Sequence, residues 1–164
     1  MPKRMSGNTL IYWVEDPAFD PALPSLALLT PARDISCAIE TGYTLNPAKS
    51  DVNTKQTICE DSKVETPVRY NYEGQMTFFR EGDLADSVSA FAKAFAFFGT
   101  TRNTGYLVRR SGPARTVSLA VGQMVDSFKF INDVPQDTVD EDLIQFSTKF
   151  LQQGRMELNK AIVA

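Results

Sequence analysis

The chain has 164 residues, 43% of them hydrophobic and 23% charged, a balance that is ordinary for one soluble globular domain. Its formal net charge of −3 argues against a binder of duplex DNA, which usually presents a basic face. The sequence has no histidine, so the commonest general base and metal ligand is missing.

No apolar run approaches the roughly 20 residues that span a bilayer, and the basic N-terminus is not followed by a signal-peptide core. We therefore expect neither a membrane span nor secretion. Two cysteines make no disulfide framework, and we expect Cys37 and Cys59 to be reduced thiols. Phosphate-binding loops and nucleophile elbows are also missing from the sequence, so it predicts no catalytic, cofactor-binding or metal-binding residue.

The beginning of the chain predicts an arm, a strand, a connector and a second strand. Residues 1–8 are expected to be a flexible arm, and residues 9–164 a single domain. Thr9–Val14 is apolar on both alternating faces, which is typical of a strand covered on both sides or of one at an interface. Three prolines make Glu15–Ser25 an extended connector, and side chains then alternate over Asp34–Glu40 as in a half-buried strand.

The segment Asn46–Thr66 is the least core-like part of the chain. It is mostly polar, and its few apolar contacts come from Val52, Ile58, Cys59 and Val64. Loops of this length without their own structure are uncommon in compact domains and are often functional. The next segment, Arg69–Phe79, alternates polar and apolar side chains and predicts a strand, with Glu73 on its polar face.

A single long helix is predicted over Leu84–Phe98. Its apolar residues recur at steps of three and four, Asp83 suits the N-cap, and Gly99 suits the position after the helix. The stripe of phenylalanines is expected to pack on the subunit's own sheet. Alanines widen the apolar surface beyond one stripe, which favours a second contact with a neighbouring subunit. That contact is expected at Ala90, Ala94 and Phe97.

After the helix, Thr104–Arg110 and Val117–Ile131 read as strands, and a slip in the apolar phase of the second predicts a bulge or bend at Gly122. Asn132–Asp142 is acidic, contains a proline and reads as a loop. Leu143–Val163 is predicted to be a hairpin whose turn lies at Gln152-Gln153-Gly154. The chain then has about seven or eight strands and one helix.

Two charge clusters admit more than one interpretation. The acids between Asp133 and Asp142 form a solvated loop, a divalent-metal loop or an acidic lining, but the glycine and the ligand spacing of a calcium loop are missing. The arginines between Arg102 and Arg115 are either solvated, phosphate-binding or paired with acids of a neighbouring subunit.

The order of these elements resembles the major tail protein, or tail tube protein, of long-tailed bacteriophages, especially those of actinobacterial hosts. The similarity spans about Thr9 to Val163 and has no single diagnostic motif. It rests on a strand, a proline-broken connector, a second strand, a long polar loop, a tyrosine-containing strand, one helix and a two-strand finish. The residues that carry it are Asp20–Ser25, Asp34-Ile35-Ser36, Gly82-Asp83 and Gln153-Gly154-Arg155.

This resemblance implies a mainly β fold, with two antiparallel sheets packed as a sandwich or small barrel and one flanking helix. It implies a non-enzymatic virion protein of the tail, assembled in the bacterial cytoplasm. Six subunits would form a ring, and inner strands would join into a channel that conducts DNA without binding it specifically. Rings would stack through the loop Asn46–Thr66, with Val52, Ile58 and Val64 as contacts, and Glu73 is a candidate for the channel wall. The other implied partners are further tail proteins, such as the tape measure and the tail terminator.

Two other functions stay open. A tail terminator or head–tail joining protein has a related fold but forms one ring only. A ligand-binding or lectin-like β-barrel would act as a monomer, although the single tryptophan and the missing metal loop give it little support. An enzyme is the least expected class, because no nucleophile can be paired with a histidine base.

Overall fold

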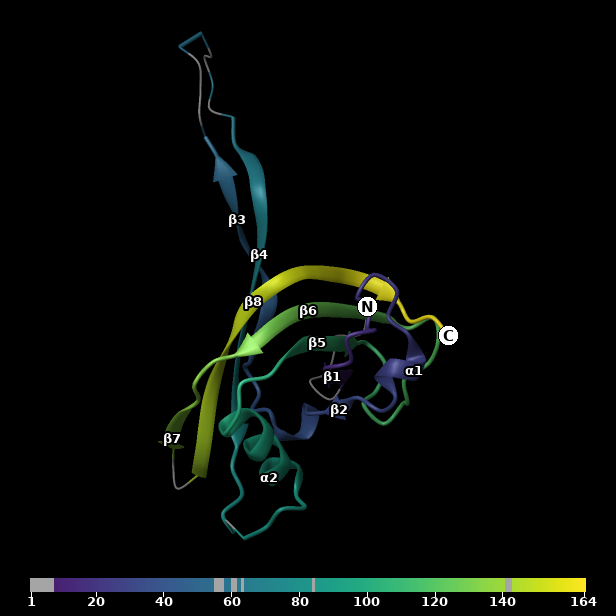
Figure 1. The fold of residues 1–164 in the computed structure, drawn as a ribbon, viewed down its shortest axis with the longest axis vertical. Helices are drawn as coiled ribbons and strands as arrows, with labels where there is room; N and C mark the ends of the chain where they lie inside the picture. Colours follow the sequence, from purple (N-terminus) through teal and green to yellow (C-terminus); the bar gives the residue numbers. More distant parts are fainter. Residues whose placement is uncertain (1–7, 55–57, 60–61, 63, 84, 141–142) are drawn as a thin grey trace.

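The computed structural model describes residues 8–54, 58–59, 62, 64–83, 85–140 and 143–164. Within these residues the fold is one eight-stranded sheet in which all pairs of named strands are antiparallel (Figure 1). The strand order is β2-β1-β5-β6-β8-β4-β3, and β7 pairs with β8 beside this path. The strands are β1 (Thr9–Val14), β2 (Arg33–Asp34), β3 (Thr44–Asn53), β4 (Thr66–Phe79), β5 (Thr104–Ser111), β6 (Met124–Asn132), β7 (Gln136–Asp140) and β8 (Leu143–Ala161).

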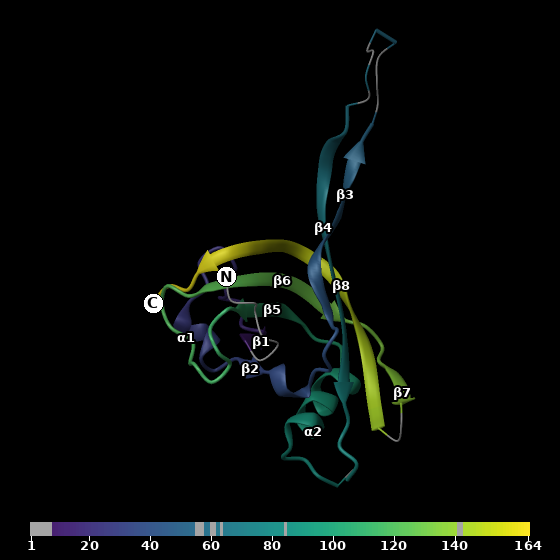
Figure 2. The same cartoon turned by 180° about the vertical axis from the view of Figure 1, so that it is seen from behind.

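Helices contribute little to the fold. They are α1 (Leu26–Leu29), a 3₁₀ turn at Ser36–Ala38, and α2 (Ala90–Ala94), which continues as a π-helical turn over Phe95–Gly99. The mainly β fold with one flanking helix is confirmed. The two layers of the expected sandwich are two halves of one bent sheet (Figure 2).

The bend lies in β8, which belongs to both halves. Its residues 145–150 pair with β4, and its residues 150–161 pair with β6. The two halves pack face to face around an aromatic core in which Trp13 of β1 meets Phe98 and Phe150 at ring-centroid distances of 5.3 and 6.0 Å. Burial of these large rings from distant strands is the main stabilising contribution to the fold.

The first strand has two buried faces, as predicted. Ile11 and Trp13 lie in the aromatic core, whereas Val14 lies in a second cluster with Phe19 and Leu29. The connector and α1 therefore cover the outer face of β1, which explains why polar residues are missing from both of its faces.

The predicted hairpin turn at Gln152-Gln153-Gly154 is wrong, because β8 runs through these residues as one strand. Between the pairs Phe128↔Met156 and Phe130↔Gln152, β6 has one residue and β8 has three, so the region is a β-bulge. The glycine that suggested a turn marks this bulge instead.

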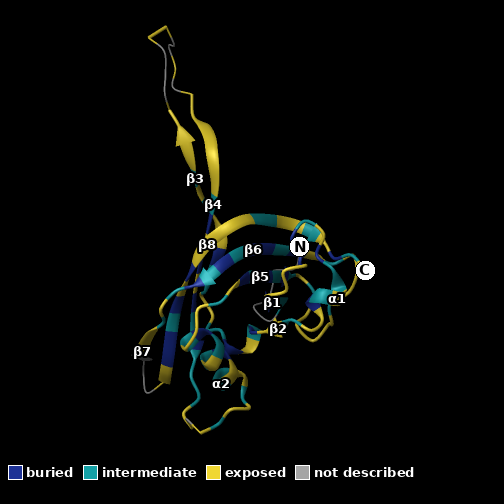
Figure 3. Ribbon diagram, viewed as in Figure 1, coloured by how far each residue is buried: buried dark blue, intermediate teal, exposed yellow. Residues whose placement is uncertain are grey.

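The predicted loop Asn46–Thr66 begins as strand, because β3 continues through Asn53 and β4 starts at Thr66. The outer parts of β3 and β4 form a hairpin that projects far beyond the body of the molecule (Figure 1), and almost all of the described residues there are exposed (Figure 3). We call residues 49–71 the arm. The sequence signal failed because strand patterning depends on burying one face, and both faces of the arm lie in solvent.

The helix begins six residues later than predicted, at Ala90, with Ser89 as its N-cap. Asp83 Oδ1 accepts a hydrogen bond from the Ala85 amide, and Asp86 Oδ1 accepts one from the Val88 amide. Such local side-chain turns compete with helical hydrogen bonding and keep this segment irregular. The predicted packing of the phenylalanine stripe on the subunit's own sheet is confirmed, because Phe91, Phe95 and Phe98 pack in the aromatic core.

Three further segments differ from the prediction. After the two-residue strand β2, Asp34 Oδ1 accepts bonds from the backbone and hydroxyl of Ser36, and the chain enters a 3₁₀ turn instead of a longer strand. Residues 117–123 are irregular, with Gly122 at φ +89°, so β6 starts only at Met124. The acidic segment expected to be a loop contains strand β7, which pairs with β8.

Candidate assembly interface

The four strands β3, β4, β8 and β7 form a sheet with one buried and one polar face. Met76, Phe78, Phe146 and Phe150 point into the aromatic core. The alternate residues point the other way, and in register they form a mainly polar surface with one acid and one base: Thr44, Asn46, Glu73, Gln75, Thr77, Gln136, Ser147 and Lys149. Glu73 is therefore exposed on the polar face, as predicted from its strand phase. The next row of this face has the half-buried Phe79 beside the buried Gln145.

Both outer strands of this four-stranded sheet have a free edge. Among the described strands, β3 pairs only with β4, and β7 pairs only with β8. Free edges present unpaired backbone groups that pair readily with another chain. Because four is an even number of alternating strands, β7 of one copy would meet β3 of the next in antiparallel orientation. The sheet can therefore continue from copy to copy with the same antiparallel alternation of strands.

The expected contact residues of the arm are exposed. Val52 and Val64 lie at 39% and 55% exposure, and Ile58 is fully exposed near the end of the arm. Exposed branched aliphatic side chains on an isolated hairpin gain nothing in the free subunit and are typical of a surface that a partner covers. Their role in assembly stays a prediction.

The three helix residues expected at a subunit interface lie in different environments. Ala94 is only 3% exposed inside the subunit's own core, so its assignment to a neighbour's surface is wrong. Ala94 lies in the regular turn before the π-helical segment, three residues after Phe91 and four before Phe98, so helical spacing itself places it on the core face with these phenylalanines. Ala90 is exposed, and Phe97 is half-buried beneath the Arg33 guanidinium at 4.1 Å.

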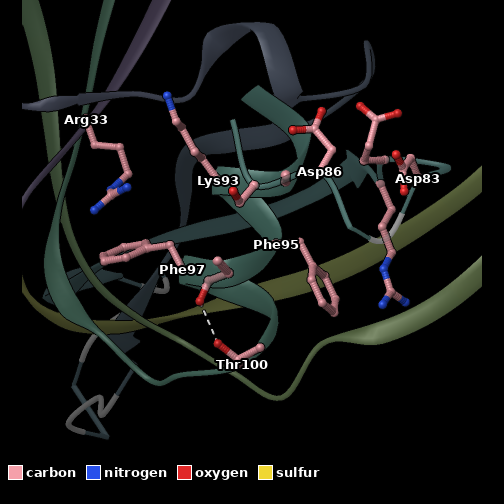
Figure 4. A pocket seen from close by; sticks show the side chains of 12 residues that line it. Arg33, Asp83, Asp86, Lys93, Phe95, Phe97 and Thr100 are labelled. Atoms are coloured by element: carbon pink, nitrogen blue, oxygen red, sulfur yellow. Dashed lines mark hydrogen bonds between the residues drawn. The ribbon is translucent and has the colours of Figure 1, made fainter. Parts of the chain in front are cut away.

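A pocket of about 490 Å³ lies beside α2 (Figure 4). Arg33 covers Phe97 on one side, and Arg80 covers Phe95 at 3.9 Å. Asp83 and Asp86 stand on the wall opposite Arg33 and Lys93 (Figure 4). The lining of this pocket therefore carries three cations, Arg33, Arg80 and Lys93, and three acids, Glu81, Asp83 and Asp86.

A second hollow lies where the arm leaves the body, between β4 and the C-terminal half of β8. We call it the notch; its volume is about 550 Å³. β4 and β8 diverge there, and the Gln152 side chain of β8 bonds to backbone groups of β4. Gln152 Oε1 accepts from the Tyr72 amide, and Gln152 Nε2 donates to the Tyr70 carbonyl. No local pattern predicts this site, because its residues come from distant parts of the chain that the bend in β8 brings together.

Tyr72 of β4 lies where β4 and β8 diverge, on the side of the aromatic core. Its hydroxyl donates to the Lys129 carbonyl at 2.6 Å and accepts from the Gly154 amide at 3.2 Å. Burial raises the pKa of the Tyr72 phenol above its ordinary value, and the hydrogen bonds with Gly154, Gln153 and Lys129 partly offset this rise. A neutral hydroxyl is required here because it both donates and accepts.

The arginine cluster does not form a phosphate-binding surface. Arg109 pairs with Asp126 at 3.0 Å, and Arg110 is only 1% exposed. Arg110 donates to the carbonyls of Ala114, Val117 and Ser118, so its function is to hold the irregular segment before β6. Arg115 donates to the Cys37 sulfur. Only Arg102 of the four makes none of these contacts and is exposed.

Metal binding, disulfide bonding and membrane-spanning helices have little support in the described part of the chain. No three acidic, histidine or cysteine side chains there are placed to hold a metal ion. Both cysteines are free and exposed. None of the helices in these residue ranges has the length and apolar character needed to cross a membrane.

The whole chain was compared with known proteins. A family model described as phage tail tube protein matches residues 1–164. No curated protein matches the chain.

Proposed function

The chain belongs to the phage tail tube protein family, and on this premise we propose that it forms hexameric rings that stack into a tube conducting DNA. As a member of this family it is a structural protein of the virion tail and not an enzyme. The observation that best supports ring formation is the four-stranded sheet β3-β4-β8-β7, with its free edge on each side. Joining these edges in a closed ring removes every exposed edge of that sheet.

The polar face of the same sheet would line the channel. Its described residues are mainly Thr, Ser, Asn and Gln, with Glu73 and Lys149 as the charged members. A wall with few cations makes few phosphate contacts, and each contact of that kind would add affinity that slows passage of DNA. The aromatic face then stays in the subunit's own core, as the burial of Phe78 and Phe146 requires.

The arm would join one ring to the next. It projects from the body along the longest axis of the molecule (Figure 1), so it reaches beyond the ring to which its own body belongs. Contacts with the tape measure and the tail terminator, and an actinobacterial host, belong to this proposal as properties of the family that the sequence resembles.

Electron microscopy and native mass measurement of the purified protein test the proposal. We expect rings and tubes, and a ring mass of about 109 kDa, six times the 18.2 kDa of one subunit. Protein that stays monomeric at high concentration and gives neither rings nor tubes would overturn the proposal. A ring that never grows into a tube would favour a tail terminator or joining protein instead.

A further inference from the structure

The notch at the base of the arm is an exposed apolar surface with a basic rim. Val68 and Tyr70 are 61% and 69% exposed, and Leu158 is 41% exposed. The residues that line the notch include Arg69 and Arg155 but no carboxylate, and the exposed Arg155 guanidinium also lies 3.9 Å from the Glu157 carboxylate. Contiguous exposed apolar side chains of this kind usually mark a binding surface.

The notch faces the arm side of the molecule. In both views the arm rises along the long axis, and the C-terminal half of β8 arches away from its base as a shoulder (Figures 1 and 2). An occupant that approaches along the axis on which the arm projects would meet the space between the arm and this shoulder.

The opposite end of the long axis carries complementary chemistry. The chain between β4 and α2 forms this end (Figure 1), and residues 81–88 contain Glu81, Asp83 and Asp86 but no base. Val88 is 74% exposed there. The local backbone bonds of Asp83 and Asp86 described above use Oδ1, and they fix the direction of each carboxylate.

We propose that the notch binds the 81–88 segment of a second copy of this chain, stacked head to tail along the long axis. This inference rests on the proposed ring stacking. It adds a second contact between stacked rings to the one proposed for the arm. Val88 enters among Val68, Tyr70 and Leu158, while the acids face Arg69 and Arg155. Head-to-tail contacts between different surfaces build open stacks, as a tube requires.

The charge pattern also sets the polarity of the stack. Two notches facing each other would bring arginines together, and two 81–88 segments would bring acids together. Like-charge contacts suppress wrong pairings, and opposite charges favour the correct one. Stacking should therefore weaken as salt is raised.

Charge exchange in the full-length protein tests the assignment. The first variant carries R69E and R155E, and the second carries E81K and D83K. Each alone should give rings but tubes at least about tenfold shorter than wild type. Mixing the two variants should restore tubes, because the exchanged surfaces attract again. Restoration on mixing would not occur if the variants had simply misfolded.

Val88→Asp tests the apolar contact, with Val121→Asp as its control because Val121 is 56% exposed outside the notch and the 81–88 segment. We expect V88D to remove stacking and V121D to leave it unchanged. Tubes of wild-type length from V88D and from both charge variants would refute the notch assignment while leaving the ring-and-tube proposal intact. A wild-type protein without rings would overturn both.

Discussion

The hydroxyl of Tyr72 is a polar group at the edge of the aromatic core, beside the β6–β8 bulge. It takes the place of ladder hydrogen bonds at this bulge, where the Lys129 carbonyl and the Gly154 amide lose their strand partners. Both hydrogen bonds are partly buried, so losing them would cost free energy, and the Tyr72 hydroxyl therefore stabilises the bulge. Gln152 performs the equivalent task for the adjacent edge of β4.

Tyr72→Phe should lower the free energy of unfolding by about 0.5–1.5 kcal/mol, because it removes the partly buried hydrogen bonds to the Lys129 carbonyl and from the Gly154 amide but no apolar contact. Urea unfolding measures the change. Tyr70→Phe is the control, since Tyr70 is largely exposed, and it should leave stability unchanged. An equal effect of the two substitutions would contradict the role given to the hydroxyl.

Stability should also fall at alkaline pH. Burial raises the pKa of Tyr72 and of Tyr12, so the folded protein favours the neutral phenols more than the unfolded chain does. The resulting stabilisation is complete below the ordinary tyrosine pKa of 10.0 and is lost as pH rises through the higher folded values. Unfolding curves from pH 8 upward should show this fall, and Tyr72→Phe should reduce its size.

Glu73→Lys tests whether the side chain of residue 73 faces the proposed DNA channel. A ring then carries a new cation from every subunit on the polar face, and each phosphate contact adds salt-dependent affinity. Tubes should assemble normally but retain duplex DNA at low salt, as a filter-binding or electrophoretic assay would show. Glu15→Lys, exposed outside this face, should not retain DNA. Equal retention by both variants would remove Glu73 from the wall.

At the scale of elements, the arm is separable from the body. Its strands bury few side chains, whereas the body of β4 carries core residues such as Met76 and Phe78. The pairing of Val52 with Pro67 continues the ladder well outside the core. Elements with few buried contacts add little to global stability and are free to serve assembly.

Replacing residues 53–66 by Gly-Ser-Asn-Gly should therefore leave the unfolding free energy of the subunit within about 0.5 kcal/mol of wild type. A four-residue connection is used because Pro67 has no amide hydrogen with which to close a two-residue turn after Val52. Rings should form and tubes should not, because the connection to the next ring is lost. Electron microscopy distinguishes these states, and tubes of normal length would show that the arm is dispensable.

For the whole molecule, the even number of strands in β3-β4-β8-β7 makes the contact between neighbouring copies antiparallel, and repeating that contact can close a ring. Each copy offers one β3 edge and one β7 edge, so every interface in a ring is the same heterologous contact. Such a ring satisfies the edges that a single subunit leaves open.

Cysteine cross-linking tests these edges. With Cys37 and Cys59 replaced by serine, cysteines placed in turn along Thr44–Ala48 and along Gln136–Thr138 should cross-link neighbouring copies under oxidation. At the matching register the products should form a ladder that ends at six subunits. Cysteine pairs placed on β2 and β5 serve as controls, and cross-linking confined to them would refute the β3–β7 contact.

Residue patterns were sufficient to predict the strand-rich class, the two-faced first strand, the polar face around Glu73 and the phenylalanine stripe on the core. Alternation and helical spacing reflect which faces of an element are buried, so these features could be predicted wherever at least one face is covered. Three other features follow from long-range packing: the polar loop is a hairpin arm, β8 bulges instead of turning, and Ala94 is buried. The arm buries neither face, and Gly154 suits a turn or a bulge equally. The notch likewise joins β4 to a distant part of β8, and local patterning carries no information about such long-range pairing.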